Sequence, residues 1–345
     1  MLMLVGLFIV ALFLTALLTG WLRRYALAAS LIDIPNARSS HQLPTPRGGG
    51  LSIVIVFLLG LLALFGLDVL PSSALWALSA AGLIVAITGF LDDHGHIAAR
   101  WRLLVHFSAA AWGLYCLGGL PPLILPVPGF DVVALDLGWL GQILAVLYLV
   151  WLLNLYNFMD GIDGLASIEA ITVSVGAALL YALQAELSAL WAAPVLLAIT
   201  VNGFLVWNYP PAKIFMGDAG SGFLGIILGL LSIQAAWLCP LFLWSWLILL
   251  AVFITDATWT LFRRLLRGDK VYQAHCSHAY QYAARCYGSH KKVTLAVAVI
   301  NIIWLLPLAL AVGLKHINAG LGLLLAYLPL ILLVIVFRAG QKELL

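Results

Sequence analysis

Apolar runs alternate with short polar stretches along the whole chain. A membrane-spanning α-helix needs about 20 predominantly apolar residues. The pattern therefore predicts eleven spanning helices, at residues 1–22, 51–67, 72–91, 103–119, 139–158, 165–184, 189–207, 221–238, 240–262, 292–313 and 319–337. No polar block between them is long enough to fold separately, so we expect one all-α, polytopic membrane domain over residues 1–345.

Composition agrees with this interpretation, since 64% of the residues are hydrophobic and only 9% are charged. A mean hydropathy of +1.10 argues against a soluble domain. The apolar start of the chain lacks a basic leading region and a clear cleavage site, so we expect a retained first helix. The four cysteines imply no disulfide framework.

Basic residues indicate the orientation, because cytoplasmic loops carry an excess of Lys and Arg. With the amino terminus outside, in the periplasm, 16 of the 17 Lys and Arg residues fall on the inner side and only Lys315 falls outside. The carboxyl terminus is then cytoplasmic. Five polar clusters also fall on the inner side, at residues 33–50, 92–102, 154–164, 208–222 and 263–292. We therefore expect the chemistry at the cytoplasmic surface.

The segment at residues 154–164 reads NLYNFMDGIDG and concentrates polar residues in a chain with few of them. Asn154, Asn157 and Asp160 are three residues apart, so they form a polar stripe if the helix continues. Such oxygen donors suit Mg²⁺, which prefers one or two carboxylates together with phosphate oxygens and water. The alternative is a helix end whose polar residues meet water.

Asp92 and Asp93 are neighbours at the end of the predicted third helix. Adjacent helical residues point about 100° apart, so only one of the two is expected to face a given site. Like charges at the hydrocarbon edge are costly unless a cation offsets them, and Arg100 or Arg102 can supply that charge. The alternative is a cap for the next segment.

Two further clusters combine glycines with groups that bind phosphate. Residues 33–50 contain His41 and Arg47 beside Gly-Gly-Gly, and glycine N–H groups with arginine bind phosphate well. In KIFMGDAGSG, at residues 213–222, Asp218 lies among glycines, Lys213 offers a charge for phosphate and Phe215 offers an aromatic face. The alternative for residues 33–50 is an ordinary basic loop on the cytoplasmic side. The alternative for residues 213–222 is a simple helix cap.

Asp256 lies inside the predicted ninth helix, where a carboxylate is either functional or paired with a basic neighbour. His275 and His278 are one helical turn apart in a basic loop. Their spacing with Cys276 and Cys286 matches no standard zinc module, so contact with a substrate phosphate is the favoured interpretation.

The inner face therefore combines carboxylates and amides for a divalent cation, basic residues for phosphates, and an aromatic platform. This combination indicates phosphoryl transfer at a membrane surface. The blocks GFLDD, NLYNFMDGIDGLAS, KIFMGDAGSGFLG and the His-x-x-His loop resemble the bacterial polyprenyl-phosphate N-acetylhexosamine-1-phosphate transferases, a superfamily that includes MraY of peptidoglycan synthesis. Four blocks in order make the resemblance specific, and the opening at residues 33–50 resembles the O-antigen branch more than MraY.

The resemblance implies transfer of a sugar-1-phosphate from UDP-N-acetylhexosamine to undecaprenyl phosphate, with release of UMP. The expected cofactor is Mg²⁺, with Mn²⁺ as an alternative, and the expected location is the bacterial inner membrane among its lipids. The implied pathway is lipid-linked O-antigen or related lipopolysaccharide synthesis. No nucleic acid is implied, and a homodimer is left open.

The resemblance also implies roles by position. It implies metal binding by Asp218 and Asn157, lipid-phosphate chemistry by Asp92 and Asp93 beside Asp218, uracil recognition by Asp163, Asn208 and Phe215, and phosphate binding by His275, His278 and Arg102. The chain departs from the family's usual His-x-His-His loop at Ser277, and His96 stands where some relatives carry an acidic residue. These departures put the sugar and the phosphate contacts in doubt.

A phosphate monoester is mostly dianionic at neutral pH, so charge neutralisation should matter more than a general base. Direct in-line displacement is therefore favoured over a covalent aspartyl intermediate. A transporter of an anionic or lipid-linked substrate is the main rival, but transport sites tend to lie near the bilayer midplane. A CDP-alcohol phosphotransferase would require a denser aspartate motif than DGIDGLAS.

Overall fold

The computed structural model describes residues 1–35, 40–41, 43–95, 97–125, 133–184, 190–269 and 275–341. His96, whose change bears on the family pattern, lies outside these residues, as do Arg38, Lys270 and Lys342 of the predicted inner face. Asp131 and Glu186, which the eleven predicted helices place in outer loops, also lie outside the described residues.

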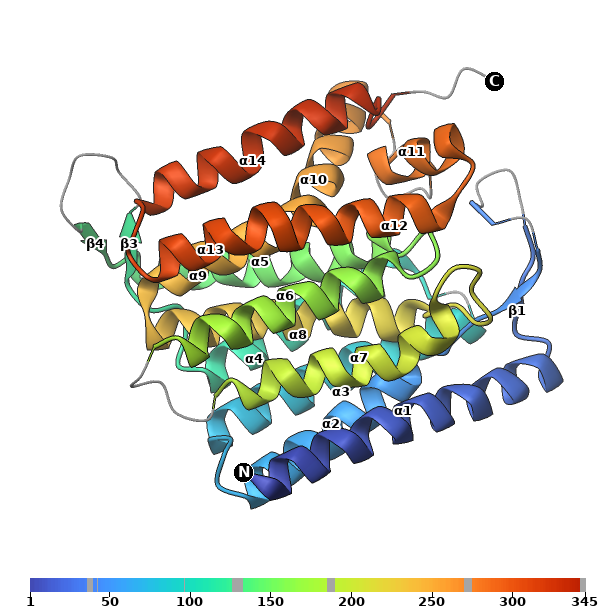
Figure 1. Cartoon of the computed structure of the whole chain (residues 1–345), viewed down its shortest axis with the longest axis horizontal. Coiled ribbons are helices and arrows are strands. Elements are labelled where there is room, and N and C mark those ends of the chain that lie inside the picture. The colour runs from blue at the N-terminus through green and yellow to red at the C-terminus, as the bar shows by residue number, and fades with distance from the viewer. Residues whose placement is uncertain are drawn as a thin grey trace.

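The described chain is a bundle of helices that run side by side for most of its length (Figure 1). The helices are α1 (Leu2–Ala28), α2 (Leu51–Gly66), α3 (Ser72–His94), α4 (Ala99–Cys116), α5 (Gly138–Met159), α6 (Leu165–Ala182), α7 (Ala192–Asn208), α8 (Asp218–Leu238), α9 (Pro240–Leu249), α10 (Ala251–Leu266), α11 (Ala279–Tyr287), α12 (His290–Val299), the π-helix η1 (Ile300–Leu305), α13 (Leu306–Gly313) and α14 (Ala319–Val336). Two short antiparallel hairpins lie at the ends of the bundle, β1 (Ile32–Asp33) with β2 (Thr45–Pro46) and β3 (Leu123–Leu125) with β4 (Val133–Leu135).

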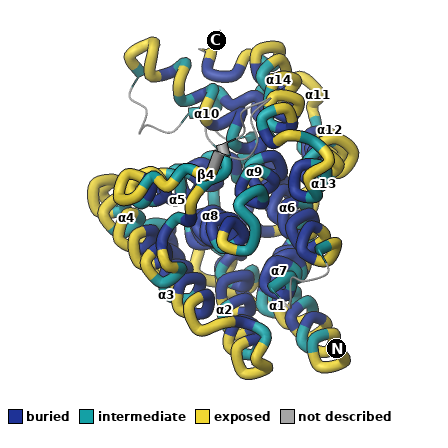
Figure 2. Tube along the Cα trace, turned by 90° about the vertical axis from the view of Figure 1, so that its left-hand side faces the viewer, coloured by how far each residue is buried: buried dark blue, intermediate teal, exposed yellow. Residues whose placement is uncertain are grey.

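Helix α8 is the centre of the bundle, and Figure 2 shows it as a buried element surrounded by other helices. Its sequence is apolar on all sides and rich in glycine, which is typical of a helix without a lipid-facing side. A Cβ atom on Gly225 would lie 2.6 Å from the Leu152 carbonyl oxygen of α5. Small residues therefore let α5 approach the α8 backbone closely.

The prediction of an all-α, polytopic membrane protein is confirmed. Among the described residues, seven helices are long and apolar enough to cross a membrane, or eight if the bent pair α9–α10 counts as one span. Every predicted range coincides with helix, but α2 and α7 are only 16 and 17 residues long. The count of eleven spans is not shown by the structure.

Three local features differ from the prediction. The expected single helix at residues 240–262 is broken between α9 and α10, which meet at a bend of 70°. Helix α11 occupies part of the expected loop, and α8 begins at Asp218 rather than at residue 221. The earlier start places Asp218 in the first turn of the central helix, where a carboxylate is favoured by the helix dipole.

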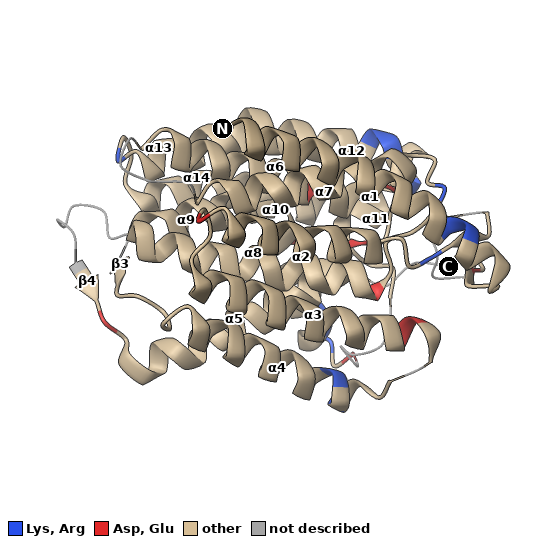
Figure 3. Cartoon of the chain, turned by 90° about the horizontal axis from the view of Figure 1, so that it is seen from below, with Lys and Arg blue, Asp and Glu red and all other residues tan. Residues whose placement is uncertain are grey.

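Most charged residues lie toward one end of the bundle, the end that carries α11 and the carboxyl terminus (Figure 3). The same end carries the loop between α5 and α6 and the start of α8. Segments far apart in the sequence are therefore brought together there.

Candidate active site

The site is organised around Asp218 at the start of α8. Its backbone N–H donates to Asp93 Oδ2 at 3.1 Å, and its Oδ1 accepts a hydrogen bond from Asn157 Nδ2 at 2.9 Å. Asn157 also donates to Ser221 Oγ at 3.0 Å, one turn along α8. Helices α3 and α5 therefore each contribute one side chain, and α8 contributes two, to a single polar network.

The adjacent residues Asp92 and Asp93 face different cavities, which confirms the expectation that only one faces a given site. Asp92 forms an ion pair with Arg102 and accepts a hydrogen bond from the Ile97 N–H at 2.8 Å. Arg102 Nη1 also lies 3.8 Å from Asp218 Oδ2, so one guanidinium is shared by two carboxylates. Arg100 instead lies against the Trp101 ring, 5.7 Å from its centroid.

A polar cavity of about 240 Å³ contains residues from all five predicted polar clusters. Five of its lining residues are carboxylates, namely Asp33, Asp93, Asp160, Asp163 and Asp218. Burial, followed by the charges of Asp218, Asp93 and Asp163, raises the pKa of Asp160 well above its usual range. Such a concentration of carboxylates favours a bound cation.

Arg47 reaches this cavity because the chain around it pairs with the segment before α8. The N–H groups of Gly49 and Gly50 donate to the carbonyls of residues 215 and 216, both at 2.9 Å, and the residue 215 N–H donates to the Pro46 carbonyl at 2.8 Å. The Arg47 guanidinium donates to the Asp93 carbonyl, and its Nη1 lies 3.9 Å from Asp93 Oδ1. Its side chain remains 41% exposed, so part of its charge is available to an anion.

Phe215 and His41 form an aromatic corner of the cavity. Their ring centroids are 4.8 Å apart in an edge-to-face arrangement. Asn208 lines the same cavity but is only 3% exposed, and both ends of its amide are used. Its Oδ1 accepts from the Gly164 N–H at 3.0 Å and its Nδ2 donates to the Ile214 carbonyl at 3.0 Å. Asn208 therefore connects two loops of the site, and its contact with a base stays a prediction.

A larger and mostly apolar cavity of about 520 Å³ adjoins the polar one. It lies among α3, α4, α5 and α8, and its polar lining includes Asp92, Arg102, His106 and Asn154. Asn157 and Asp218 line both cavities. Leu103, Phe107 and Leu147 line the apolar cavity and are at least 38% exposed, so the cavity adjoins the lipid-facing surface.

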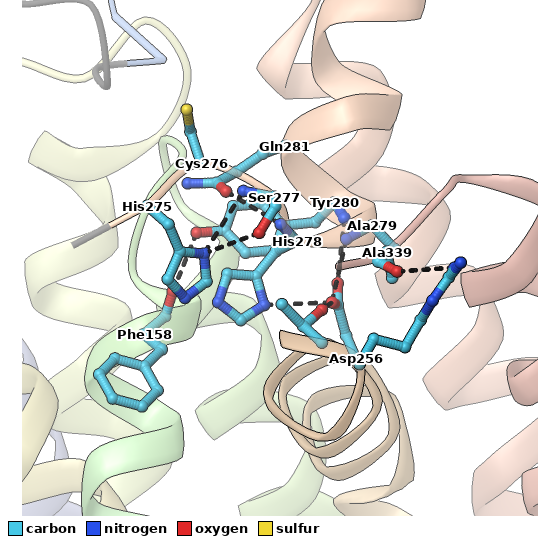
Figure 4. A network of polar contacts seen from close by, with 12 residues as sticks. Phe158, Asp256, His275, Cys276, Ser277, His278, Ala279, Tyr280, Gln281 and Ala339 are labelled. Atoms are coloured by element: carbon cyan, nitrogen blue, oxygen red, sulfur yellow. Dashed lines mark hydrogen bonds and ion pairs between the residues drawn. The ribbon is translucent and has the colours of Figure 1, made fainter. Parts of the chain in front are cut away.

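Asp256 and His278 form a separate buried network that anchors α11 (Figure 4). Asp256 accepts hydrogen bonds from the N–H groups of Ala279 and Tyr280, both at 3.0 Å, and lies 3.2 Å from His278 Nδ1. His278 is 2% exposed and stacks on His275 at a centroid distance of 4.8 Å. Asp256 thus pairs with a histidine and a helix start rather than with arginine.

His275, His278 and Lys213 line neither the polar nor the apolar cavity. Burial, followed by the charges of His278 and Arg264, lowers the pKa of His275 to about 3, so its ring is neutral at physiological pH. Lys213 Nζ lies over the Trp207 ring, 5.6 Å from its centroid. The structure brings none of the three to the polar cavity, and their binding to phosphate stays a prediction.

Two lining histidines escaped the sequence analysis. His106 is one turn beyond Arg102 on α4, and this i, i+4 spacing is a signal that the sequence does contain. His290 begins α12 and faces Asp163, a residue 127 positions earlier, which no local pattern indicates.

Comparison with known proteins agrees with this geometry. A probable undecaprenyl-phosphate N-acetylglucosaminyl 1-phosphate transferase of Bacillus subtilis is 30% identical over 341 residues, which cover 95% of this chain and 90% of the relative. The sequence profile of glycosyl transferase family 4 matches residues 75–236. The chain belongs to glycosyl transferase family 4.

Other relatives of this family 4 chain align over smaller parts. A decaprenyl-phosphate N-acetylglucosaminephosphotransferase of Mycolicibacterium smegmatis is 30% identical over 63% of this chain and 56% of the relative. A phospho-N-acetylmuramoyl-pentapeptide-transferase of Rhodopseudomonas palustris is 33% identical over 58% of this chain and 62% of the relative. The profile match runs from α3 to α8, so it includes Asp92, Asp93, Asp160, Asp163 and Asp218 but not Asp33, Arg47 or His290.

Proposed function

We propose that the chain transfers an N-acetylhexosamine-1-phosphate from a UDP-linked sugar to a polyprenyl phosphate and releases UMP. The observation that carries this proposal is the meeting of a polar and an apolar cavity at Asp218 and Asn157. The reaction joins a water-soluble diphosphate to a phosphate on a long hydrocarbon chain. A site for it therefore needs two such cavities with the reacting phosphates at their junction.

The apolar cavity suits the acceptor. Its exposed lining residues Leu103, Phe107 and Leu147 allow a prenyl chain to enter from the bilayer. Arg102 lies at the end of this cavity that adjoins Asp218 and is 33% exposed, so it can hold the acceptor phosphate. The names of the relatives, which specify undecaprenyl or decaprenyl phosphate, support this assignment.

The polar cavity suits the sugar nucleotide. Arg47 would neutralise a phosphate of the donor, and Phe215 would stack on the base. Asp163 lies near Phe215 on the wall that this cavity shares with an adjoining one of about 670 Å³. We infer a UDP-N-acetylhexosamine as donor, in a pathway of O-antigen or related envelope polysaccharide.

Asp218 and Asn157 would hold Mg²⁺ or Mn²⁺ at the junction. No group of three or more His, Cys, Asp or Glu side chains in the described part of the chain forms a complete metal site. Mg²⁺ takes few protein ligands and completes its shell with phosphate oxygens and water. Asn157 would have to turn its amide so that its oxygen faces the ion. When bound, the cation would neutralise charge that develops on the diphosphate.

The proposed reaction is a single in-line displacement at phosphorus. An oxygen of the acceptor phosphate forms a bond to the phosphorus that carries the sugar, and the bond from that phosphorus to the UMP oxygen breaks. The acceptor is already largely dianionic at neutral pH, so its oxygen needs no strong base. Arg102 would hold this dianion, and Arg47 would offset the charge on the donor and on the departing UMP.

The decisive experiment supplies purified protein with UDP-N-acetylglucosamine, undecaprenyl phosphate and Mg²⁺. We expect equal amounts of UMP and a lipid-linked diphosphate sugar, and neither product when the lipid is omitted. Release of UMP without the lipid product, or no turnover with any UDP-N-acetylhexosamine, would contradict the proposal.

We propose that the chain crosses the inner membrane eleven times and that the charged end of the bundle lies on the cytoplasmic side. In a variant without native cysteines, a cysteine at Arg100 should react with an impermeant reagent only after the cells are opened. A cysteine at Asp136 should react in intact spheroplasts. Both positions are exposed, so accessibility to the reagent depends on the side of the membrane. Reaction of both positions from the same side would show the topology to be wrong.

Phe215→Ala should raise the KM for the UDP-sugar about tenfold, because stacking on an aromatic ring contributes about 1–3 kcal/mol per base. Phe215 is partly exposed in the cavity, so its loss should leave the fold intact. Steady-state kinetics at saturating lipid test this expectation. Phe262→Ala is the control, because Phe262 is 54% exposed and lines neither the polar nor the apolar cavity. An unchanged KM would remove Phe215 from the nucleotide site.

A further inference from the structure

His290 joins two segments that are distant in the sequence. It is the first residue of α12, and its ring lies between Asp163, in the loop after α5, and the backbone of Ser40. Nδ1 lies 3.2 Å from Asp163 Oδ1, and Nε2 lies 3.0 Å from the Ser40 carbonyl oxygen. The side chains of His290 and Asp163 are only 18% and 12% exposed, so solvent weakens this contact little.

The remaining contacts of Asp163 show that the carboxylate is held in one orientation. Its Oδ2 accepts a hydrogen bond from the Ala212 N–H at 3.0 Å, and its backbone carbonyl accepts from Thr294 Oγ1 at 2.8 Å. Thr294 is one turn beyond His290, so the first turn of α12 holds Asp163 at two points. Each carboxylate oxygen still has a lone pair for a ligand.

Both ring nitrogens of His290 face a hydrogen-bond acceptor, Asp163 Oδ1 at Nδ1 and the Ser40 carbonyl oxygen at Nε2. Only an imidazolium donates from both nitrogens, to Asp163 Oδ1 and to the Ser40 carbonyl at once. The backbone N–H of Asp163 lies 3.4 Å from the same Nδ1 and gains an acceptor only when that nitrogen is unprotonated. His290 Nδ1 lies closer to the Asp163 carboxylate, at 3.2 Å, than to the Asp163 N–H, at 3.4 Å. The carboxylate is therefore the partner that orients the ring.

Two buried polar atoms beside this bridge point to a ligand. Ser40 Oγ and His41 Nε2 are buried and have no hydrogen-bond partner among the described residues. Both residues line the polar cavity and the adjoining cavity of about 670 Å³, together with Asp163, Phe215 and His290. An unpaired buried polar atom is costly, so a ligand with hydrogen-bonding groups at this place would relieve the cost.

We propose that His290 is a positioning residue for the nucleotide part of the donor, holding Asp163 on one side and the Ser40–His41 segment on the other around the face of Phe215. The ligand is a planar base with its ribose, a uridine nucleotide if the proposed function holds, and the inference rests on that function. His290 acts through Asp163 and Ser40 and not on the reacting phosphates, which lie nearer Asp218.

The test is a double-mutant cycle on binding and turnover. UMP affinity is measured by titration calorimetry for wild type, His290→Ala, Asp163→Asn and the double variant. We expect each single variant to weaken UMP binding about tenfold, as for loss of a hydrogen bond to a charged group. The double variant should bind UMP more tightly than the sum of the two single losses predicts, because only the part of the His290 effect that passes through Ser40 remains once Asp163 is changed.

Kinetics separate positioning from chemistry. His290→Ala should raise the KM for the UDP-sugar about tenfold and leave kcat within about threefold of wild type, the pattern of lost ground-state binding. His290→Gln keeps one donor toward Asp163 and should recover most of the affinity. His290→Leu keeps bulk without a donor and replaces the alanine variant in the cycle if that variant fails to fold. His316→Ala, exposed beyond α13, is the matched control and should bind UMP as wild type does.

Several outcomes would overturn the inference. Additive losses in the cycle would show that His290 acts independently of Asp163, and unchanged UMP affinity in the variant without a donor, His290→Ala or His290→Leu, would remove it from nucleotide binding. A wild-type protein that forms lipid product while the His290 variants keep its KM would defeat this inference alone. A wild-type protein that forms no product would defeat the proposed function as well.

Discussion

Asp218→Asn is expected to lower kcat by at least about 100-fold, in the range seen when one electrostatic stabiliser is removed from an active site. The substitution keeps the size of the side chain and one oxygen but removes the charge shared with Arg102 and Asn157. Asp218 also lines both cavities, so its charge lies where the two substrates would meet. Turnover at saturating concentrations of both substrates measures the effect.

The control for this variant is Asp68→Asn, at the turn between α2 and α3 at the other end of the bundle. Asp68 has a φ of +57°, a conformation that asparagine also adopts readily, so the control should remain near wild type in activity and stability. Added Mg²⁺ should restore Asp218→Asn only in part, because both ion affinity and charge placement change. A stable Asp218→Asn protein with near-normal turnover at low Mg²⁺ would show that the ion is held elsewhere, with Asp92 or Asp93 as the next candidates.

Hydropathy predicts the positions of the helices well, because burial in lipid requires long apolar segments wherever they later pack. It does not predict the bend between α9 and α10, since Leu250 lies within continuous apolar sequence. It also misses α11, a short polar helix whose start depends on hydrogen bonds to Asp256 from a different helix. Tertiary contacts of this kind leave no periodic signal in the segment itself.

The candidate site, like the fold, is predictable from the sequence only where it does not depend on tertiary contacts. The grouping of Asp93, Asn157 and Asp218 is predictable, because each stands at an end of an apolar run that the charge pattern assigns to the same side of the membrane. The sequence does not show that Asp92 faces the apolar cavity or that Asn208 connects loops, since both depend on rotation and packing of the helices. His290 is hidden for the same reason, because its partners are 127 and 250 residues away.

The close approach of α3 to α8 gives the second large expected effect. Gly89 of α3 lies against the first turn of α8, where an added Cβ would be 2.5 Å from the backbone of Asp218 and Ala219. Backbone atoms cannot move aside as a flexible side chain can, so a methyl group there must displace the start of α8 or separate the two helices. Either change alters the relative positions of Asp93, Asp218 and Asn157, which now meet through bonds of about 3 Å.

Gly89→Ala is therefore expected to lower kcat about 100-fold, because a misplacement of about 1 Å in a catalytic constellation can cost that much. Its thermal unfolding midpoint in detergent should also fall, since overpacking a tight interface is destabilising by about 1–3 kcal/mol. Gly66→Ala is the matched control, because an added Cβ at the end of α2 meets nothing within 4 Å. The control should be as stable and active as wild type or slightly more stable, since alanine favours helix more than glycine does. If Gly89→Ala retained both activity and unfolding midpoint, α3 and α8 could separate without moving Asp218, and the catalytic geometry would not depend on their contact.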